Sequence, residues 1–259
     1  MKKILIYAAL FIFTASGCKK TERISYSGVF RLDKQTISGG GNDTVLVRKQ
    51  MKIYTGHNYM YAGMTPDTSV SFGVGSYELD SGNRIIEHNI YSNRALDSTQ
   101  IFVVKVSKTP KGRTQVVPDF GTNKSVSYTS TEDYTKIPTT SASALDGVWE
   151  LDKAFLVKGK DTIRRHETRF KAYWGGHFMF IRHYPVNAVG TEYKNGFGYG
   201  SFSLKNDMLS EETEMSNHAA LLNRKLTIKV TFNGTDEYTQ VINDPETNEQ
   251  TTEIYDRLR

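Results

Sequence analysis

The chain carries one stretch of sequence twice, and this internal repeat constrains the fold more than any other feature. Residues 28–34 (GVFRLDK) return as residues 147–153 (GVWELDK), with five identical positions in seven. Further matches follow in the same order in both halves, namely 42–45 with 160–163, 56–61 with 176–181, 72–77 with 197–202, 114–117 with 239–242, and 131–137 with 252–258. Each copy is longer than the repeat unit of a solenoid and as long as a small domain. We therefore expect two tandem domains, at residues 27–137 and 146–259, joined by a linker at 138–145.

Both copies have the hydrophobic pattern of β-strands. An apolar residue occupies every second position in two matching segments, which hold Phe102, Val104 and Val106 in the first copy and Leu226, Ile228 and Val230 in the second. This alternation predicts a strand whose apolar face is turned inward. Turn-forming residues recur at intervals of roughly 10–20 residues, and no segment has the pattern of a long amphipathic helix. Each copy has room for about eight strands, which favours an all-β protein of two closed antiparallel barrels.

The N-terminal segment has the pattern of a signal peptide. Lys2 and Lys3 precede an apolar run at residues 4–13. A helix of that length spans about 15 Å, roughly half of a bilayer core, so the run is too short to cross a membrane. It matches instead the apolar region of a secretory signal peptide, which is removed from the mature protein.

The residues after the apolar run resemble the lipobox of bacterial lipoproteins. Ala15, Ser16 and Gly17 are the small residues before Cys18, which is the only cysteine of the chain. The resemblance implies cleavage after residue 17, a diacylglyceryl thioether on Cys18, a further acyl chain such as palmitate on the new amine, and a lipidated tether at residues 18–26. Several acyl chains anchor a protein stably, whereas one chain does not. The alternative is a plain secretory signal with an incidental cysteine.

Lipidation of Cys18 would place the protein in the cell envelope. Lys19 and Lys20 follow the cysteine in place of an acidic run. We therefore expect an anchor in the outer membrane with the protein on its periplasmic face. The membrane is then the first expected partner.

The net charge of +5 belongs mostly to this N-terminal region. Removal of residues 1–17 takes away Lys2 and Lys3 and leaves +3, and residues 18–26 hold a further +2. The rest of the chain therefore carries about +1 and has no basic run interleaved with aromatic residues, which argues against a nucleic-acid partner. A single cysteine also excludes a disulfide framework and a multi-thiolate metal cluster within the chain.

The two ends of each copy resemble the calycin superfamily of lipocalins and fatty-acid-binding proteins. In the second copy the resemblance rests on Gly147 and Trp149 at the beginning and on Tyr255, Arg257 and Leu258 at the end; the first copy has Gly28, Phe30, Tyr134, Lys136 and Ile137. The resemblance implies lipocalin-like barrels in which Trp149 closes the base beneath Arg257. It implies the same structural role for Phe30 and Lys136. We expect Arg257 to stack on Trp149 in a cation–π contact of about 1 kcal/mol.

Two departures from the fatty-acid-binding proteins favour a lipocalin-like variant without a lid. Residues 34–43 are too few for the helical lid of that family. Glu132 and Glu253 also stand where that family has an arginine that meets the fatty-acid carboxylate. A buried glutamate would repel a carboxylate, so fatty-acid binding in that manner is not expected.

Few residues have the spacing of a catalytic or metal site. The six histidines are scattered, no Gly-x-Ser-x-Gly nucleophile turn occurs, and no carboxylates stand out as a general acid and base. We therefore expect no catalytic residue, metal or cofactor. His57 and His177 match in the repeat alignment and are interpreted either as pocket-lining hydrogen-bond partners or as turn residues. Candidate ligand-binding residues are these two histidines with Tyr61, Tyr134 and Tyr255.

These observations lead to one functional hypothesis and two alternatives. The first is a non-enzymatic, lipid-anchored lipoprotein that binds a small apolar or amphipathic ligand in its barrels. The second is a structural or adaptor lipoprotein with filled barrels that binds an envelope protein, and the third is an enzyme with a polar cluster in one barrel only. Cavities of roughly 300 Å³ or more would favour the first, and interiors filled by side chains would favour the second.

Overall fold

The computed structural model describes residues 26–80, 82, 84–93, 100–119, 127–187, 190–244, 247 and 249–259. The predicted signal peptide and the lipidation site Cys18 lie outside the described residues. Among the described residues, no helix is long and apolar enough to cross a membrane.

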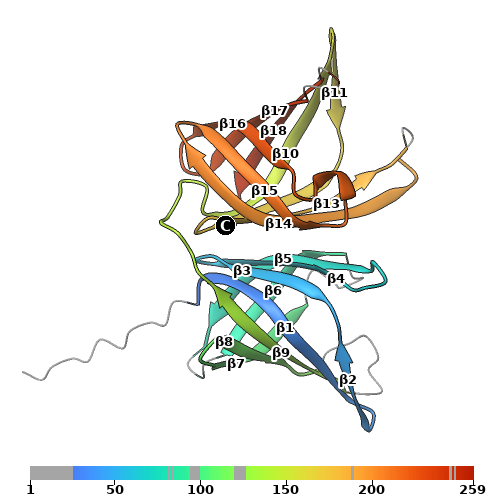
Figure 1. The fold of residues 1–259 in the computed structure, drawn as a ribbon, viewed down its shortest axis with the longest axis vertical. Helices are drawn as coiled ribbons and strands as arrows, with labels where there is room; N and C mark the ends of the chain where they lie inside the picture. The colour runs from blue at the N-terminus through green and yellow to red at the C-terminus, as the bar shows by residue number, and fades with distance from the viewer. Residues whose placement is uncertain are drawn as a thin grey trace, which may run out of the picture.

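The protein consists of two closed antiparallel β-barrels in tandem (Figure 1), which confirms the predicted fold class. The first barrel comprises β1 (Gly28–Gly39), β2 (Asn42–Leu46), β3 (Lys49–Tyr54), β4 (Asn58–Met64), β5 (Val70–Leu79), β6 (Arg84–Ser92), β7 (Ile101–Lys108), β8 (Gly112–Val117) and β9 (Thr129–Ile137). The second comprises β10 (Gly147–Lys158), β11 (Asp161–Arg165), β12 (Thr168–Trp174), β13 (His177–Pro185), β14 (Tyr193–Lys205), β15 (Met208–Ser216), the short 3-10 helix η1 (Ala219–Leu221), β16 (Lys225–Asn233), β17 (Glu237–Asp244) and β18 (Glu249–Arg257).

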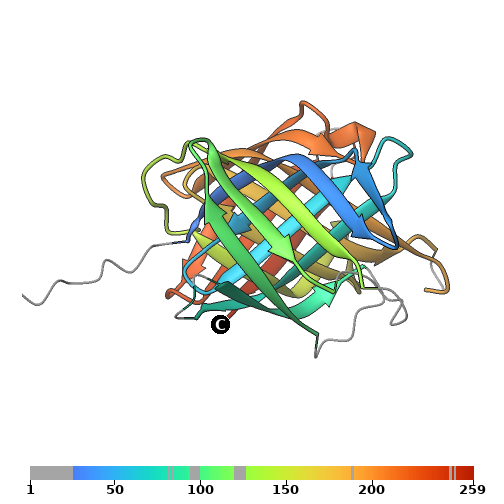
Figure 2. The ribbon, with the colours of Figure 1, turned by 90° about the horizontal axis from the view of Figure 1, so that it is seen from below.

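Each barrel has eight strand positions and closes between its first and last strands. β1 pairs with β9, and β10 pairs with β18. β2 and β3 pair in turn with the far and near halves of β1, so together they fill one position, and β11 and β12 do the same against β10. Figure 2 shows the strong tilt of the strands that this closure requires. We call the end of a barrel that holds Phe30 or Trp149 its base, and the end beside the β1–β2 or β10–β11 hairpin its mouth.

The hydrogen-bond register corrects the repeat alignment at two hairpins. Tyr54 pairs with Tyr59 in the first barrel, and Tyr173 pairs with Phe178 in the second. This pairing makes Asn58 the equivalent of His177, so His57 and His177 do not match. The matched block at 42–45 is also shifted by one residue, because Gly39 pairs with Asn42 as Lys158 pairs with Asp161. Similar residues at the hairpin tips suggested the wrong alignment, whereas the strand pairing determines it.

The predicted inward faces of β7 and β16 are confirmed. Val104 is fully buried in the core of the first barrel, where Phe102 and Val106 pack beside it. Ile228 and Val230 are fully buried in the core of the second barrel, with Leu226 beside them. Aromatic and aliphatic side chains fill the base half of both barrels.

A third apolar core lies between the two barrels, where β3, β4 and β5 face β12, β13 and β14 (Figure 1). We call it the inter-barrel cluster. Its buried members are Val29, Met51, Ile53, Met60, Ala62, Phe72 and Val74 from the first barrel and Val148, Phe170, Ala172, Met179, Ile181, Phe197 and Tyr199 from the second. These strands are therefore buried on both faces, and the two barrels form one packed unit.

Candidate functional site

The interior of the second barrel contains a buried lysine, tyrosine and glutamate in direct contact. Nζ of Lys171 lies 2.9 Å from Oε1 of Glu211, and the Tyr173 hydroxyl donates to the same carboxylate oxygen at 2.5 Å. Burial, and then the charge of Glu211, raises the pKa of Tyr173 well above its usual value, so the hydroxyl keeps its proton and acts as a donor. The first barrel holds the equivalent residues Lys52, Tyr54 and Glu87, with Lys52 Nζ 2.7 Å from Glu87 Oε1.

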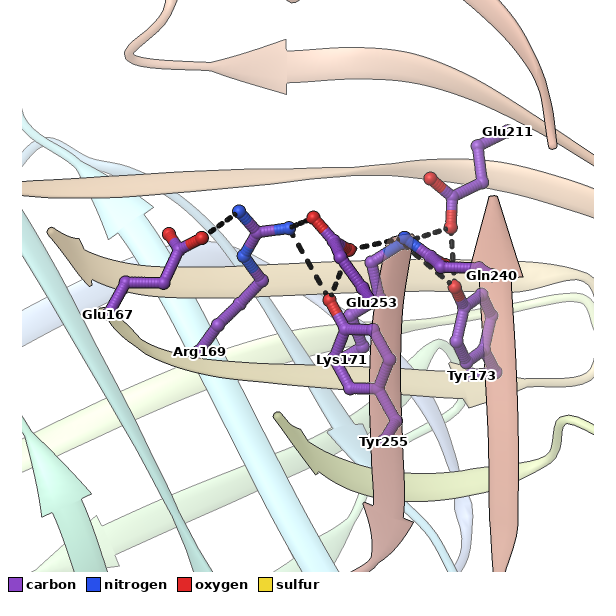
Figure 3. Close-up of polar contacts among 8 residues, drawn as sticks. All are labelled: Glu167, Arg169, Lys171, Tyr173, Glu211, Gln240, Glu253 and Tyr255. Atoms are coloured by element: carbon purple, nitrogen blue, oxygen red, sulfur yellow. Dashed lines mark hydrogen bonds and ion pairs between the residues drawn. The ribbon is translucent and has the colours of Figure 1, made fainter. Parts of the chain in front are cut away.

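A second buried carboxylate extends this network towards the mouth (Figure 3). Glu253 accepts hydrogen bonds from the Tyr255 hydroxyl at 2.8 Å and from Nε2 of Gln240 at 2.5 Å. Lys171 donates to Oε1 of Gln240 at 3.2 Å, which joins the two carboxylates into one network. In the first barrel, Tyr134 donates to Glu132 at 2.8 Å in the same way.

The two barrels stabilise the equivalent buried carboxylates, Glu253 and Glu132, with different partners. In the second barrel, Arg169 forms an ion pair with Glu253 and contacts Glu167 at 2.7 Å. Burial opposes the charged form of Glu253, but Arg169 and then Lys171 outweigh it and hold the pKa of this carboxyl below its usual value. The first barrel uses neutral amides instead: Gln35 donates to Glu132 at 3.0 Å, and Gln50 stands at the position of Arg169.

Four arginines gather at the mouth of the second barrel, at positions where the first barrel has other residues. The strand pairing makes Arg165, Arg169, Arg182 and Arg224 the equivalents of Leu46, Gln50, Gly63 and Gln100. Arg169 and Arg182 are cross-strand partners and so point to the same side of the sheet, into the barrel. At these four positions only the second copy has cationic side chains, whereas the first copy has Arg48, hydrogen-bonded to Gln50, where the second has Glu167.

These arginines and Lys171 line a pocket of about 230 Å³ in the second barrel. Phe180, Leu221, Leu226 and Ile242 supply an apolar wall. The two carboxylates in the lining, Glu211 and Glu253, are already paired with Lys171 and Arg169. An acidic group with an apolar part complements this lining.

Arg182 is the cation of the pocket that is best placed to bind an added anion. Its Nη2 donates to Nε2 of His218 at 2.7 Å, its Nε is buried without a partner, and it forms no ion pair with a described carboxylate. Burial, and then repulsion from Arg169, lowers the pKa of Arg182. A Cβ at Gly196 would approach Arg182 Nε to 2.8 Å, so a glycine on β14 makes room for the guanidinium. An anion bound at this site would supply the negative charge that Arg182 lacks among the described carboxylates.

The residues predicted to bind a ligand lie in different places. Tyr134 and Tyr255 are buried in the interior networks, and Tyr61 lies inside the first barrel over Gly73. His57 is exposed in the β3–β4 turn, and His177 lies at the base of the second barrel, where its Nε2 is 3.0 Å from the Pro138 carbonyl oxygen. Neither histidine lines the pocket described above: His57 is a turn residue, and His177 is the first residue of β13. Sequence reasoning missed the arginines, which a position-by-position comparison of the two copies in the correct register would have found.

The base of each barrel is closed by an arginine over an aromatic ring. The Arg257 guanidinium lies 4.0 Å from the Trp149 ring centroid, as expected from the sequence, and its Nη1 donates to the Asp146 carbonyl at 2.7 Å. In the first barrel the expected partner Lys136 is exposed, and Arg113 of β8 lies 3.6 Å from the Phe30 ring instead. The assignment of Lys136 to this role is therefore corrected, because Arg113 already occupies the ring face.

We predict energetic coupling between Trp149 and Arg257. In a double-mutant cycle of Trp149→Phe and Arg257→Met, measured by urea unfolding, the coupling should be a measurable part of about 1 kcal/mol, since Arg257→Met removes the cation–π contact and Trp149→Phe weakens it. The matched control pairs Trp149→Phe with Arg259→Met, whose exposed guanidinium contacts Asp236. Additive effects in the first cycle would show that the stacking contributes nothing to stability.

The comparisons with known proteins supply no family. No family model matches the chain, and no curated protein matches it. Among solved structures, a protein of unknown function from the DUF3598 family of Nostoc punctiforme aligns over 90% of this chain and 96% of its own, with 8% sequence identity and a TM-score of 0.27. So weak a similarity carries no inference about function.

Proposed function

We propose that this is a lipid-anchored protein of the bacterial cell envelope that binds a small amphipathic molecule with an acidic group at the mouth of its second barrel. The observation that carries the proposal is a pocket with an apolar wall that is surrounded by four arginines, where the first barrel has Leu46, Gln50, Gly63 and Gln100. The anchor at Cys18 is supported by its resemblance to the lipobox. The proposal includes no catalytic step.

The size of the pocket limits the ligand. At about 230 Å³ it is smaller than the roughly 300 Å³ at which drug-sized sites begin. Aromatic side chains such as Trp149, Tyr173 and Tyr238 occupy the base half of the barrel. The acidic group would therefore enter the mouth, and the apolar part would lie along Leu221 and Leu226 without reaching the base.

The filled base halves support a second candidate, an adaptor that binds an envelope protein. In that case the barrels act as rigid supports and an outer surface carries the function. The excess of arginine at one mouth favours the binding of a small molecule, because an adaptor that acts through its outer surface does not require four arginines around a pocket in one barrel.

The experiment uses an amphipathic sulfonate, 1-anilinonaphthalene-8-sulfonate, as a fluorescent probe on the full chain. Two changes that leave the paired Arg169 in place, Arg182→Gln and Arg224→Gln together, should weaken probe binding by about tenfold or more, since charge-assisted hydrogen bonds contribute about 1.5–3 kcal/mol. Lys34→Asp, on the exposed face of β1 in the other barrel, changes the net charge by the same amount and should leave most of the binding intact.

Two results would oppose the proposal. Equal probe binding by the wild type and the double variant would show that the arginines form no anion site. Native mass spectrometry of the protein extracted from its own membrane would then distinguish a small-molecule binder from an adaptor. A stoichiometric protein partner and no small molecule would support the adaptor.

A further inference from the structure

A second cationic pocket lies at the base of the first barrel, away from the proposed ligand site. Its volume is about 340 Å³, and among the described residues its lining includes Lys108, Lys111, Arg113 and Lys136 but no aspartate or glutamate. Tyr26, Phe30 and Val106 supply its apolar surface. The four positive charges are therefore gathered without a negative charge in the lining.

The base of the second barrel shows that this charge is not a requirement of the fold. The register makes Ser27, Lys111, Arg113 and Lys136 equivalent to Asp146, Asp236, Tyr238 and Arg257. There the arginine is compensated, because Asp236 lies 3.8 Å from Nε of Arg257. One copy of the same scaffold thus has two acids and one cation where the other has three cations and no acid.

The cations of the first base also have the arrangement of an anion site. Arg113 forms the floor, with 4% of its surface exposed and its guanidinium held 3.6 Å from the Phe30 ring and 4.3 Å from the Tyr54 ring. Lys108, Lys111 and Lys136 are exposed above it, and none of the three forms an ion pair with a described residue. A planar guanidinium below flexible ammonium groups suits the tetrahedral oxygens of a phosphate.

The pocket lies beside the point at which the chain leads back to the predicted anchor. Tyr26, in the pocket wall, is eight residues from Cys18. Eight residues span at most about 28 Å, which is comparable to the thickness of a bilayer core. If Cys18 is lipidated, the pocket stays within reach of the headgroups.

We propose that the base of the first barrel binds a phosphate group, and that its source is the headgroup of an anionic phospholipid. The phosphate site stands on the pocket itself, whereas the lipid as its source rests on the anchor in the proposed function. Headgroup binding adds a second attachment beside the acyl chains, and it turns the base of the first barrel towards the membrane.

The experiment measures lysine acetylation on the full lipidated chain by mass spectrometry. The chain is bound to vesicles of pure phosphatidylcholine or of phosphatidylcholine with one fifth phosphatidylglycerol. Anionic vesicles should slow the acetylation of Lys108, Lys111 and Lys136 by about fivefold each, because a lysine at an anionic surface gains about that factor in binding. Lys160, exposed in the β10–β11 hairpin, is the internal control and should react equally on both vesicles.

The other arms separate the sources of the phosphate. Inorganic phosphate added to neutral vesicles should protect the three lysines less than the anionic lipid does; equal protection would confirm the phosphate site and overturn the lipid as its source. In Lys111→Asp, which introduces the residue of the second barrel, protection of Lys108 and Lys136 should fall. An absence of protection in both arms, or undiminished protection in this variant, would overturn the proposal.

A failure of the proposed function would give a different result from a failure of the phosphate site. A chain that does not float with neutral vesicles would lack the anchor, and the phosphate arm can then be repeated in solution. The variant Arg182→Gln/Arg224→Gln should leave lysine protection unchanged, since those arginines line the other barrel.

Discussion

Met179→Asp is expected to destabilise the protein by more than about 4 kcal/mol, because it buries a carboxylate without a partner. Met179 points away from the interior of its own barrel, yet it is fully buried in the inter-barrel cluster. Its equivalent in the first barrel, Met60, is buried in the same cluster. The charge would therefore lie between two apolar surfaces, so urea unfolding should show a large loss of stability.

Two controls make this result specific. Met179→Leu keeps the volume and the apolar character and should cost less than about 1.5 kcal/mol. Thr227→Asp introduces the same charge on the exposed face of β16 and should change stability by only about 0.5 kcal/mol. If Met179→Asp costs no more than Thr227→Asp, the barrels do not pack through this face.

The second large effect is expected for Arg169→Gln, which introduces the residue of the first barrel. This change leaves the buried Glu253 without its ion-pair partner and should cost about 3–5 kcal/mol at pH 7. In the wild type the pKa of Glu253 is lowered, so its contribution to stability is lost as pH falls through that pKa. In the variant, burial without Arg169 raises the pKa, and protonation relieves the penalty. The stability difference between the two proteins, measured by urea unfolding, should shrink from pH 7 towards pH 4.

The first barrel also shows how this loss can be repaired. Gln35 donates to Glu132 there, and Ala154 occupies the equivalent position in the second barrel. Ala154→Gln combined with Arg169→Gln should therefore recover part of the lost stability, whereas Ala154→Gln alone should destabilise by overpacking beside Arg169. A double variant that is less stable than Arg169→Gln would contradict this account of Glu253.

Much of the fold follows from patterns that are local in the sequence. The repeat predicts two domains of one kind, and the alternation around Val104 and Ile228 predicts strands with those side chains inside. The contact between Trp149 and Arg257 agrees with what the resemblance of the two end motifs to the lipocalins implies. The alignment of His57 with His177 is wrong, because sequence similarity at a hairpin tip does not determine the hydrogen-bond register.

The orientation of β3 shows what alternation leaves open. Its residues alternate as Gln50, Met51, Lys52 and Ile53, and a barrel with a solvated outer surface would turn the apolar pair inward. The structure does the reverse, with Lys52 inside against Glu87 and with Met51 and Ile53 in the inter-barrel cluster. Because β3 is buried on both faces, the usual rule that the apolar face of a strand turns into the barrel does not apply to it.

The sequence by itself determined that the protein is a duplicated antiparallel barrel, because strand periodicity and repeated end motifs are carried by residues close along the chain. Only the tertiary structure decided which face of a strand between the barrels, such as β3, turns inward and where charge accumulates. Arg165, Arg169, Arg182 and Arg224 are spread over four segments, and each alone is an ordinary charged residue of a strand or its flank. Barrel closure brings them around one pocket, just as it gathers Lys111, Arg113 and Lys136 at the other barrel's base. Electrostatic excess depends on distances between strands, and those distances exist only in the folded protein.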